Sequence, residues 1–142
     1  DVVAGPGSLE GTTVRGDEIP TLLDEVPILA VLAVRARGQT RFRGVAELRV
    51  KETDRIEALV RNFRTLGVET DDGPDHLTVV GGAVRLSGAV DSFGDHRIAM
   101  AFGVLDALPG NEIRVRGGEV VEISYPGFWD DLQRVKQELE AA

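Results

Sequence analysis

The sequence predicts a mixed α/β (α+β) fold, and three observations support this class. Apolar residues recur at helical spacing from Ile56 to Leu66, which is typical of a helix with one buried face. Short strand-like runs alternate with such helices along the chain. The pattern also repeats at an offset of about 71 residues. With 142 residues, the chain can bury roughly two thirds of its unfolded surface in one compact unit.

The first expected elements are a short strand and a long helix. Thr12-Thr13-Val14-Arg15 has strand character, and we expect it to be the tail of a preceding unit. The apolar run over 26–34 is about half the roughly 20 residues that a membrane-spanning helix needs, and Pro27 interrupts it. We therefore expect no membrane span but a buried helix over 20–37, followed by a strand over 40–45.

The next expected elements are a capped helix and a hairpin. The apolar face predicts a helix over 53–66, which Gly67 ends as a C-terminal cap. A hairpin follows, with strands over 68–71 and 77–80 joined by the turn Asp72-Gly73-Pro74-Asp75.

The second half of the chain repeats this order. A strand over 83–90 leads into a helix over 95–108, for which Asp95 is the expected N-cap. A strand over 112–116 and a final helix over 126–139 follow, and we expect all helices to pack behind one shared sheet. The aromatic residues near the start of the last helix are expected to pack rather than to stack on a ligand: Tyr125, Phe128 and Trp129.

The repeat relates two segments that each contain an acidic residue, a helix, a glycine and a strand. The segment from Asp24 to Gly44 runs parallel to the segment from Asp95 to Gly117. The match continues towards a further helix in each copy, with two more pairs in register: Val50 with Val121, and Thr53 with Ser124. We expect one domain over 1–142, with repeat units of approximately 12–82 and 83–142, the second ending without its hairpin.

The composition excludes some chemistries and narrows the class of partner. The chain contains no cysteine, so disulfides, zinc–thiolate sites and cysteine nucleophiles are excluded within it. Its net charge is −8, whereas nucleic-acid-binding domains are normally basic, so we expect no nucleic-acid partner.

The chain begins Asp1-Val2-Val3, has Met100 as its single methionine and shows no basic, apolar leader. We therefore expect a piece of a longer cytoplasmic protein.

The segment Arg49-Val50-Lys51-Glu52-Thr53-Asp54-Arg55 is the most informative because it places five ionisable groups at the start of a helix. If the helix begins near Glu52, then Lys51, Glu52 and Arg55 can converge on one ligand near the first-turn amides. The simpler alternative is an exposed Glu52–Arg55 pair, worth a few tenths of a kcal/mol. Residues 35–64 carry nine Arg and Lys against four Asp and Glu, so this local charge of +5 favours a small anionic substrate.

This motif, followed by the helix and Gly67 and taken with Asp95-His96-Arg97, closely resembles the family of 3-phosphoshikimate 1-carboxyvinyltransferase, also called EPSP synthase. The resemblance covers essentially the whole chain. It implies a carboxy-terminal part of that enzyme, with about two of the three βαβαββ units of one inverse-barrel-like lobe.

The resemblance implies an activity and its partners. The family transfers the enolpyruvyl group of phosphoenolpyruvate to the 5-hydroxyl of shikimate 3-phosphate, in the shikimate pathway of aromatic amino acid biosynthesis, without a metal or organic cofactor. The implied partners are these two substrates and the missing amino-terminal lobe. Because the active site closes between two lobes, we expect this chain alone to be inactive.

The resemblance also implies roles for individual residues. Asp24 would contact the substrate hydroxyls and act as the base for the attacking one; a charge favoured by the helix dipole is the simpler alternative. Glu52 would move the proton at the methylene carbon, and the sequence leaves its protonation state open. Lys51 would contact shikimate 3-phosphate and the reacting oxygens.

Two arginines and a histidine complete the implied site. Arg55 and Arg97 would grip phosphoenolpyruvate, because a guanidinium fork suits a carboxylate or a phosphate. His96 would lie near the transferred group, and a capping or packing role is its alternative. The implied catalytic residues are Asp24, Glu52 and His96, and the implied substrate-binding residues are Asp24, Lys51, Arg55 and Arg97.

One departure and two rivals stay open at this point. Many family members carry a lysine just before the final aromatic–proline pair, where this chain has Ile123, which favours a subfamily without that lysine. UDP-N-acetylglucosamine enolpyruvyl transferase shares the fold, but the Lys-Glu-Thr-Asp-Arg run favours the shikimate enzyme. A non-catalytic anion-binding module is the rival from another class. Asp24 and Glu52 argue against it, because carboxylates in its site would not contribute to the binding of an anion.

Overall fold

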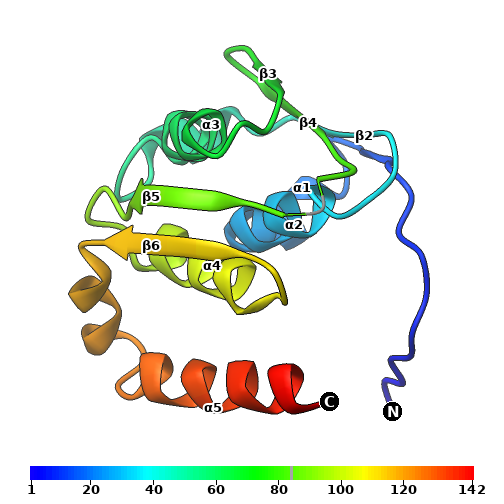
Figure 1. Ribbon diagram of the computed structural model, residues 1–142. Helices are drawn as coiled ribbons and strands as arrows, with labels where there is room; N and C mark the ends of the chain where they lie inside the picture. Colours follow the sequence, from blue (N-terminus) through cyan, green and yellow to red (C-terminus); the bar gives the residue numbers. More distant parts are fainter. Residues whose placement is uncertain (84) are drawn as a thin grey trace.

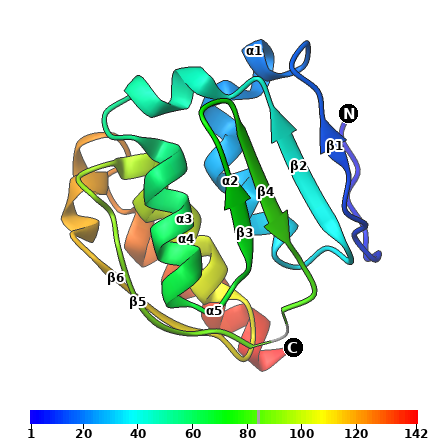
Figure 2. The same cartoon turned by 90° about the horizontal axis from the view of Figure 1, so that it is seen from above.

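The structure, a computed structural model, describes residues 1–83 and 85–142 and contains two separate sheets (Figures 1 and 2). The larger sheet has the order β1-β2-β4-β3 and consists of β1 (Thr13–Val14), β2 (Gln39–Arg43), β3 (Thr70–Asp72) and β4 (His76–Val80). The smaller sheet pairs β5 (Ser87–Asp91) with β6 (Glu112–Arg116). The pairs β1–β2 and β5–β6 are parallel, whereas β4 runs antiparallel to both β2 and β3.

The helices follow the order expected from the sequence, except that two helices, α1 and α2, replace the first expected one. They are α1 (Ile19–Leu22), α2 (Val26–Ala33), α3 (Arg55–Thr65), α4 (His96–Ala107) and α5 (Phe128–Ala141), with 3₁₀ turns η1 (Leu23–Glu25), η2 (Ala46–Val50) and η3 (Gly118–Ile123). The mixed α/β class is therefore confirmed. Within the described residues, no helix has both the length and the apolar character to cross a bilayer.

The prediction of one shared sheet with helices behind it was wrong. Seen from above, α2, α3 and α4 lie between the four-stranded sheet and the β5–β6 pair (Figure 2). Helix α3 contacts β3 and β5, and α4 contacts α2 and β6. The reason is visible in α4, where Ile98, Ala99, Ala101 and Phe102 are all buried and which contacts α2 and α3 as well as β6. One sheet covers only one side of a helix, so this helix needs a second apolar surface.

The helix expected over 20–37 is broken in two. Helix α1 ends at Leu22, a single 3₁₀ turn follows, and α2 begins at Val26 with Pro27 in its first turn. Proline lacks an N–H and its ring clashes with the carbonyl one turn earlier, so it starts a helix rather than continuing one. Beyond Ala33 the chain tightens into 3₁₀-type bonds and turns at Gly38, whose φ of +84° favours glycine.

Helix α3 begins two residues later than expected but ends as predicted. Asp54 is its N-cap, accepting a hydrogen bond of 2.9 Å from the Glu57 N–H, so the helix starts at Arg55. At the other end, Gly67 has a φ of +78° and donates to the Arg64 carbonyl, while Val68 donates to the Phe63 carbonyl. This pair of bonds is a Schellman cap.

The second half of the chain agrees with the predicted order and differs at some boundaries. Asp95 caps α4 as predicted, accepting from the Arg97 N–H at 2.9 Å. Strand β6 coincides with the predicted range, and α5 begins at Phe128. Strand β5 begins at Ser87 rather than at residue 83, and Val84 of the predicted strand lies outside the described residues.

The core joins the two halves of the chain through α3 and α4. The rings of Phe63 and Phe102 lie 5.2 Å apart between their centroids, tilted by 56°. Buried Asn62 on α3 receives a 3.0 Å hydrogen bond from the Asp91 N–H and donates one of 2.8 Å to its carbonyl. The amide thus pairs with the end of β5, which satisfies polar groups that would be costly to bury alone.

Trp129 holds the last helix against α4, so its predicted packing role is confirmed. Its indole N–H donates to the Gly118 carbonyl at 2.9 Å. A Cβ added at Gly103 would lie 2.7 Å from Trp129 Cζ3.

We expect Gly103→Ala to lower the free energy of unfolding by about 1–3 kcal/mol through overpacking, measured by urea denaturation. In a Trp129→Phe background, which removes the crowding atoms, the same change should cost clearly less; equal costs would contradict this explanation.

Candidate functional site

Three helices begin at the same end of the molecule and bring the predicted site residues together. In Figure 2 the starts of α2, α3 and α4 all lie towards the top of the view. Asp24 lies in η1 just before α2, Lys51 and Glu52 lie in the connection before α3, and the segment 95–97 begins α4. Each helix start carries partial positive charge from its free N–H groups. Side-chain caps from Asp54 and Asp95 already use part of this charge at α3 and α4.

Arg55 is the centre of this cluster. Its side chain is 1% exposed, and it is the first residue of α3. Its Nε donates to Asp95 Oδ2 at 2.7 Å, its Nη1 to Asp24 Oδ1 at 3.1 Å, and its Nη2 to Glu52 Oε2 at 2.6 Å. Three carboxylates from three segments thus surround one guanidinium group.

The two sides of this guanidinium group differ in burial. Asp95 is fully buried, with a 0% exposed side chain, and also receives a 3.4 Å bond from Nη2 of Arg55. Asp24 and Glu52 are 49% and 54% exposed. Burial by itself lowers the pKa of Arg55, but the hydrogen bond and charge of Asp95 and the charges of Glu52 and Asp24 outweigh it and raise that pKa. Arg55 is therefore a permanent cation with one buried and two half-exposed partners.

The remaining predicted cations lie around Asp24. Lys51 Nζ is 3.8 Å from Asp24 Oδ1, and Arg97 Nη1 donates to the Asp24 carbonyl at 3.2 Å and to Glu25 Oε1 at 3.4 Å. Asp24 and Arg97 also line a pocket of about 210 Å³ between the starts of α2 and α4. Lys51 and Glu52 precede α3, which begins at Arg55, so their convergence does not need a helix start near Glu52.

The sequence did not indicate the contacts that Asp95 and Glu25 make in the cluster, and for His96 the structure gives only a position. Asp95 was predicted only as a cap, yet it is the nearest carboxylate to the Arg55 Nε. Glu25 was not predicted, although it pairs with Arg97. Arg55 and Asp95 are 40 positions apart in the sequence, so no local signal indicates their contact. His96 is half-buried at the first position of α4.

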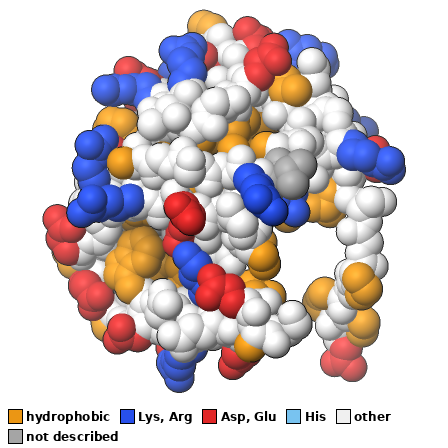
Figure 3. All heavy atoms as spheres, in the orientation of Figure 1, with side chains coloured by type: hydrophobic (Ala, Val, Ile, Leu, Met, Phe, Trp, Pro, Cys, Tyr) orange, Lys and Arg blue, Asp and Glu red, His pale blue; other side chains and the backbone are white. Residues whose placement is uncertain are grey.

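The basic stretch over 35–64 does not form one basin. Arg37 pairs with Glu10 at the opposite end of α2, whereas Arg49 pairs with Asp54 and Asp72. On the face drawn in Figure 3, basic and acidic side chains are interspersed. Basic residues of this stretch are therefore paired with acids outside it, Glu10 and Asp72, and with Asp54 within it.

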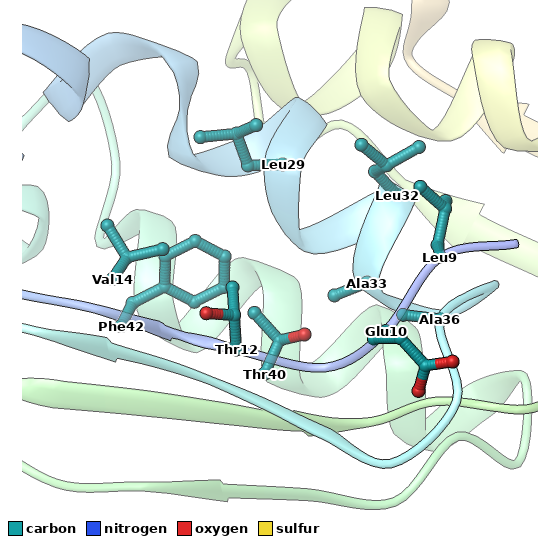
Figure 4. A pocket seen from close by; sticks show the side chains of 10 residues that line it. All are labelled: Leu9, Glu10, Thr12, Val14, Leu29, Leu32, Ala33, Ala36, Thr40 and Phe42. Atoms are coloured by element: carbon teal, nitrogen blue, oxygen red, sulfur yellow. The ribbon is translucent and has the colours of Figure 1, made fainter. Parts of the chain in front are cut away.

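A separate apolar groove lies away from the charged cluster, between α2 and the strands β1 and β2 (Figure 4). Its volume is about 230 Å³. Figure 4 shows Leu29 and Leu32 on the helix side, opposite Val14, Thr12 and Phe42. None of the predicted site residues lines it.

The fold and the site define a class: an α/β protein in which three helix starts gather carboxylates around a buried arginine beside a small pocket. The family model of EPSP synthase (3-phosphoshikimate 1-carboxyvinyltransferase) matches residues 1–132. The chain belongs to this family, so the resemblance found in the sequence is confirmed.

Relatives and solved structures agree with this assignment. A 3-phosphoshikimate 1-carboxyvinyltransferase of Thermus thermophilus is 50% identical over 127 residues, covering 89% of this chain and 29% of the relative. That of Aquifex aeolicus is 43% identical over 136 residues, covering 95% and 32%. The structure of EPSP synthase from Acinetobacter baumannii matches with a TM-score of 0.83 and 32% identity, covering 90% of this chain and 30% of that one. The chain therefore spans about a third of the length of the curated relatives it matches.

Proposed function

We propose that this chain supplies one side of the active site of an EPSP synthase, and that the remainder of the longer protein supplies the other side. The complete protein would transfer the enolpyruvyl group of phosphoenolpyruvate to the 5-hydroxyl of shikimate 3-phosphate. Without the other part, this chain would be catalytically silent. The shared family and the coverage of about a third of each relative support this proposal.

The observation that carries the proposal is the arrangement of partners around Arg55. Its inner side is fixed by buried Asp95, whereas its outer N–H groups contact two half-exposed carboxylates, Asp24 and Glu52. A substrate carboxylate or phosphate offers the same paired oxygens and would replace these two side chains. Anion binding would then release Asp24 and Glu52 for proton transfer.

For the individual residues we propose the roles that the family resemblance implies. Asp24, once released, would accept the proton of the attacking hydroxyl, and Glu52 would move the proton at the methylene carbon. Arg55 and Arg97 would hold the anionic groups of phosphoenolpyruvate. Lys51 would contact shikimate 3-phosphate and the reacting oxygens. His96, at the start of α4, would lie beside the transferred group.

We also propose that the chain comprises two repeat units, of approximately 12–82 and 83–142, from one carboxy-terminal lobe. With α1 and η1 left aside, the first unit has the order β1, α2, β2, η2 and α3, and the second has the order β5, α4, β6, η3 and α5. The first and third members of each series pair in parallel. The first unit continues with the hairpin β3–β4, and the second has no such hairpin among its described residues.

A ligand titration of the ¹⁵N-labelled chain tests the proposed site. We expect amide shifts at Asp24, at 51–55 and at 96–97 on addition of phosphoenolpyruvate or shikimate 3-phosphate, because these residues surround the exchangeable side of Arg55. The affinity should be weak, since part of the site is contributed by the rest of the protein. UDP-N-acetylglucosamine serves as the matched control.

The titration separates the candidate functions. Shifts with the first two ligands but not with the control would support the shikimate enzyme. Shifts with the sugar nucleotide instead would favour the related enolpyruvyl transferase. If both ligands leave all these amides unchanged in a well-dispersed spectrum, the idea of a preformed half-site would have to be abandoned.

A further inference from the structure

Arg49 links two segments that are far apart in the sequence. Its Nη1 donates to Asp54 at 3.0 Å (Oδ2) and 3.3 Å (Oδ1). Its Nη2 donates to Asp72 Oδ2 at 3.0 Å and to the Gly73 carbonyl at 2.5 Å. Asp54 is the N-cap of α3, and residues 72–73 lie at the β3–β4 turn. One guanidinium group thus joins the start of α3 to the hairpin.

The pair Arg49–Asp54 closes a short loop around the residues of the proposed site. Only Val50, Lys51, Glu52 and Thr53 lie between the two members. All three side chains of the contact are about a quarter exposed, at 26% for Arg49 and 28% for each aspartate, so the bonds are partly shielded from water. Val50 is 80% exposed and contributes little packing to hold the loop. Besides the ion pairs of Lys51 with Asp24 and of Glu52 with Arg55, the loop is therefore held by the polar contacts at its ends.

The β3–β4 turn also holds the beginning of the same connection. The Asp75 carbonyl accepts from the Gly44 N–H at 3.0 Å, and Asp75 Oδ1 accepts from the Ala46 N–H at 2.9 Å. A Cβ at Gly73 would lie 2.6 Å from His76 Cε1, so a side chain there would displace the His76 ring. Through the bonds of Asp75 and Arg49, the turn contacts both ends of η2.

The second half of the chain makes the equivalent connection in another way. Between β6 and α5 the turn η3 is held by the neutral bond from the Trp129 indole to the Gly118 carbonyl. At the offset of about 71 residues, Arg49 corresponds to Val120 and Asp54 to Tyr125. The same order of elements therefore forms without the arginine, so the fold alone does not explain Arg49.

We infer that Arg49 is a positioning residue: by tying Asp54 to the β3–β4 turn, it holds the loop that presents Lys51 and Glu52 to the anion bound at Arg55. A charged, bidentate contact suits this purpose because it fixes direction as well as distance. The significance of this positioning rests on the proposed function, whereas the ordering of the loop can be measured without any substrate.

The test compares variants of the 142-residue chain by NMR without ligand. We expect Arg49→Gln to lower the heteronuclear NOE of 51–53 and to raise amide exchange at Glu57, whose N–H is held by Asp54, by about tenfold relative to α4 amides. Asp72→Asn, which leaves the Asp54 contact in place, should have the same effect to a smaller degree. Arg49→Lys should restore order only in part, because a point charge cannot reproduce the fork.

Trp129→Phe is the matched control, since it weakens the equivalent brace in the second half of the chain. It should lower thermal stability and leave 51–53 and Glu57 unchanged. The inference is overturned if Arg49→Gln and Asp72→Asn both leave these amides as in the parent chain, or if every variant loosens both halves equally.

A phosphoenolpyruvate titration of the same samples separates this inference from the proposed function. If the parent chain binds, we expect Arg49→Gln to raise the apparent Kd about fivefold through the loosened loop. If the parent chain does not bind, the proposed half-site fails while the loop measurements still decide the inference.

Discussion

Replacing Arg55 with methionine is expected to destabilise the chain by about 3–5 kcal/mol, because it leaves the buried Asp95 carboxylate without its cation. Arg55 is 1% exposed and Asp95 is 0% exposed, so water cannot compensate the loss. Domains of this size are typically stable by only about 5–15 kcal/mol. We therefore expect a large shift of the urea midpoint, measured by far-UV circular dichroism.

Two further variants make this prediction specific. Arg64→Met removes an exposed arginine from the same helix and should change the free energy of unfolding by less than about 0.5 kcal/mol. Arg55→Met combined with Asp95→Leu should regain much of the loss, because it replaces a buried ion pair by apolar groups. The regain should be incomplete, since Asp95 also caps α4. A single Arg55→Met variant as stable as Arg64→Met would contradict the buried role of Arg55.

Replacing Glu52 with glutamine is expected to lower kcat by about 10²–10⁴-fold, the usual contribution of a positioned acid or base. The measurement uses a chimera in which this chain replaces the corresponding segment of the Thermus thermophilus relative, which is 50% identical over 127 residues. The two parts of the proposed site are then in one protein. Because the Glu52 side chain is 54% exposed, its loss should leave the stability of the fold nearly unchanged.

Glu57→Gln is the matched control for this chimera. Glu57 lies five residues further along, is exposed on α3 and takes part in the cap only through its backbone N–H. We expect it to retain kcat within about twofold of the parent, because surface changes away from the site have little effect. If Glu52→Gln behaves like Glu57→Gln in phosphate release, Glu52 does not transfer the proton.

Local patterns in the sequence were sufficient for the element order and for the caps. The apolar spacing over 56–66 indicated α3, and Gly67 and Asp95 indicated its end and the start of α4. These features depend on contacts within one or two turns, which the neighbouring residues encode directly. The break at Pro27 has a local cause as well, but the long apolar run around it is equally compatible with one continuous helix.

Some partners of the candidate site residues depended on contacts over long distances in the sequence. Spacing indicated that Glu52 could meet Arg55, and the structure has this contact at 2.6 Å. Spacing could not indicate that Asp95 would lie beneath the same guanidinium group, since no periodic pattern connects residues 40 positions apart. The division into two sheets arose in the same way, because which strands pair is decided by the packing of α2, α3 and α4.

The sequence by itself therefore determined the α/β class, the family and the charged segment 49–55. All three can be recognised from the order of neighbouring residues along the chain. Only the tertiary structure decided which carboxylates share Arg55 and that Arg49 braces the loop against the β3–β4 turn. The physical reason is that a buried cation needs partners of opposite charge from whichever segments reach it. Here the packing of the helix starts, not the order of residues along the chain, brings Asp24 and Asp95 to Arg55.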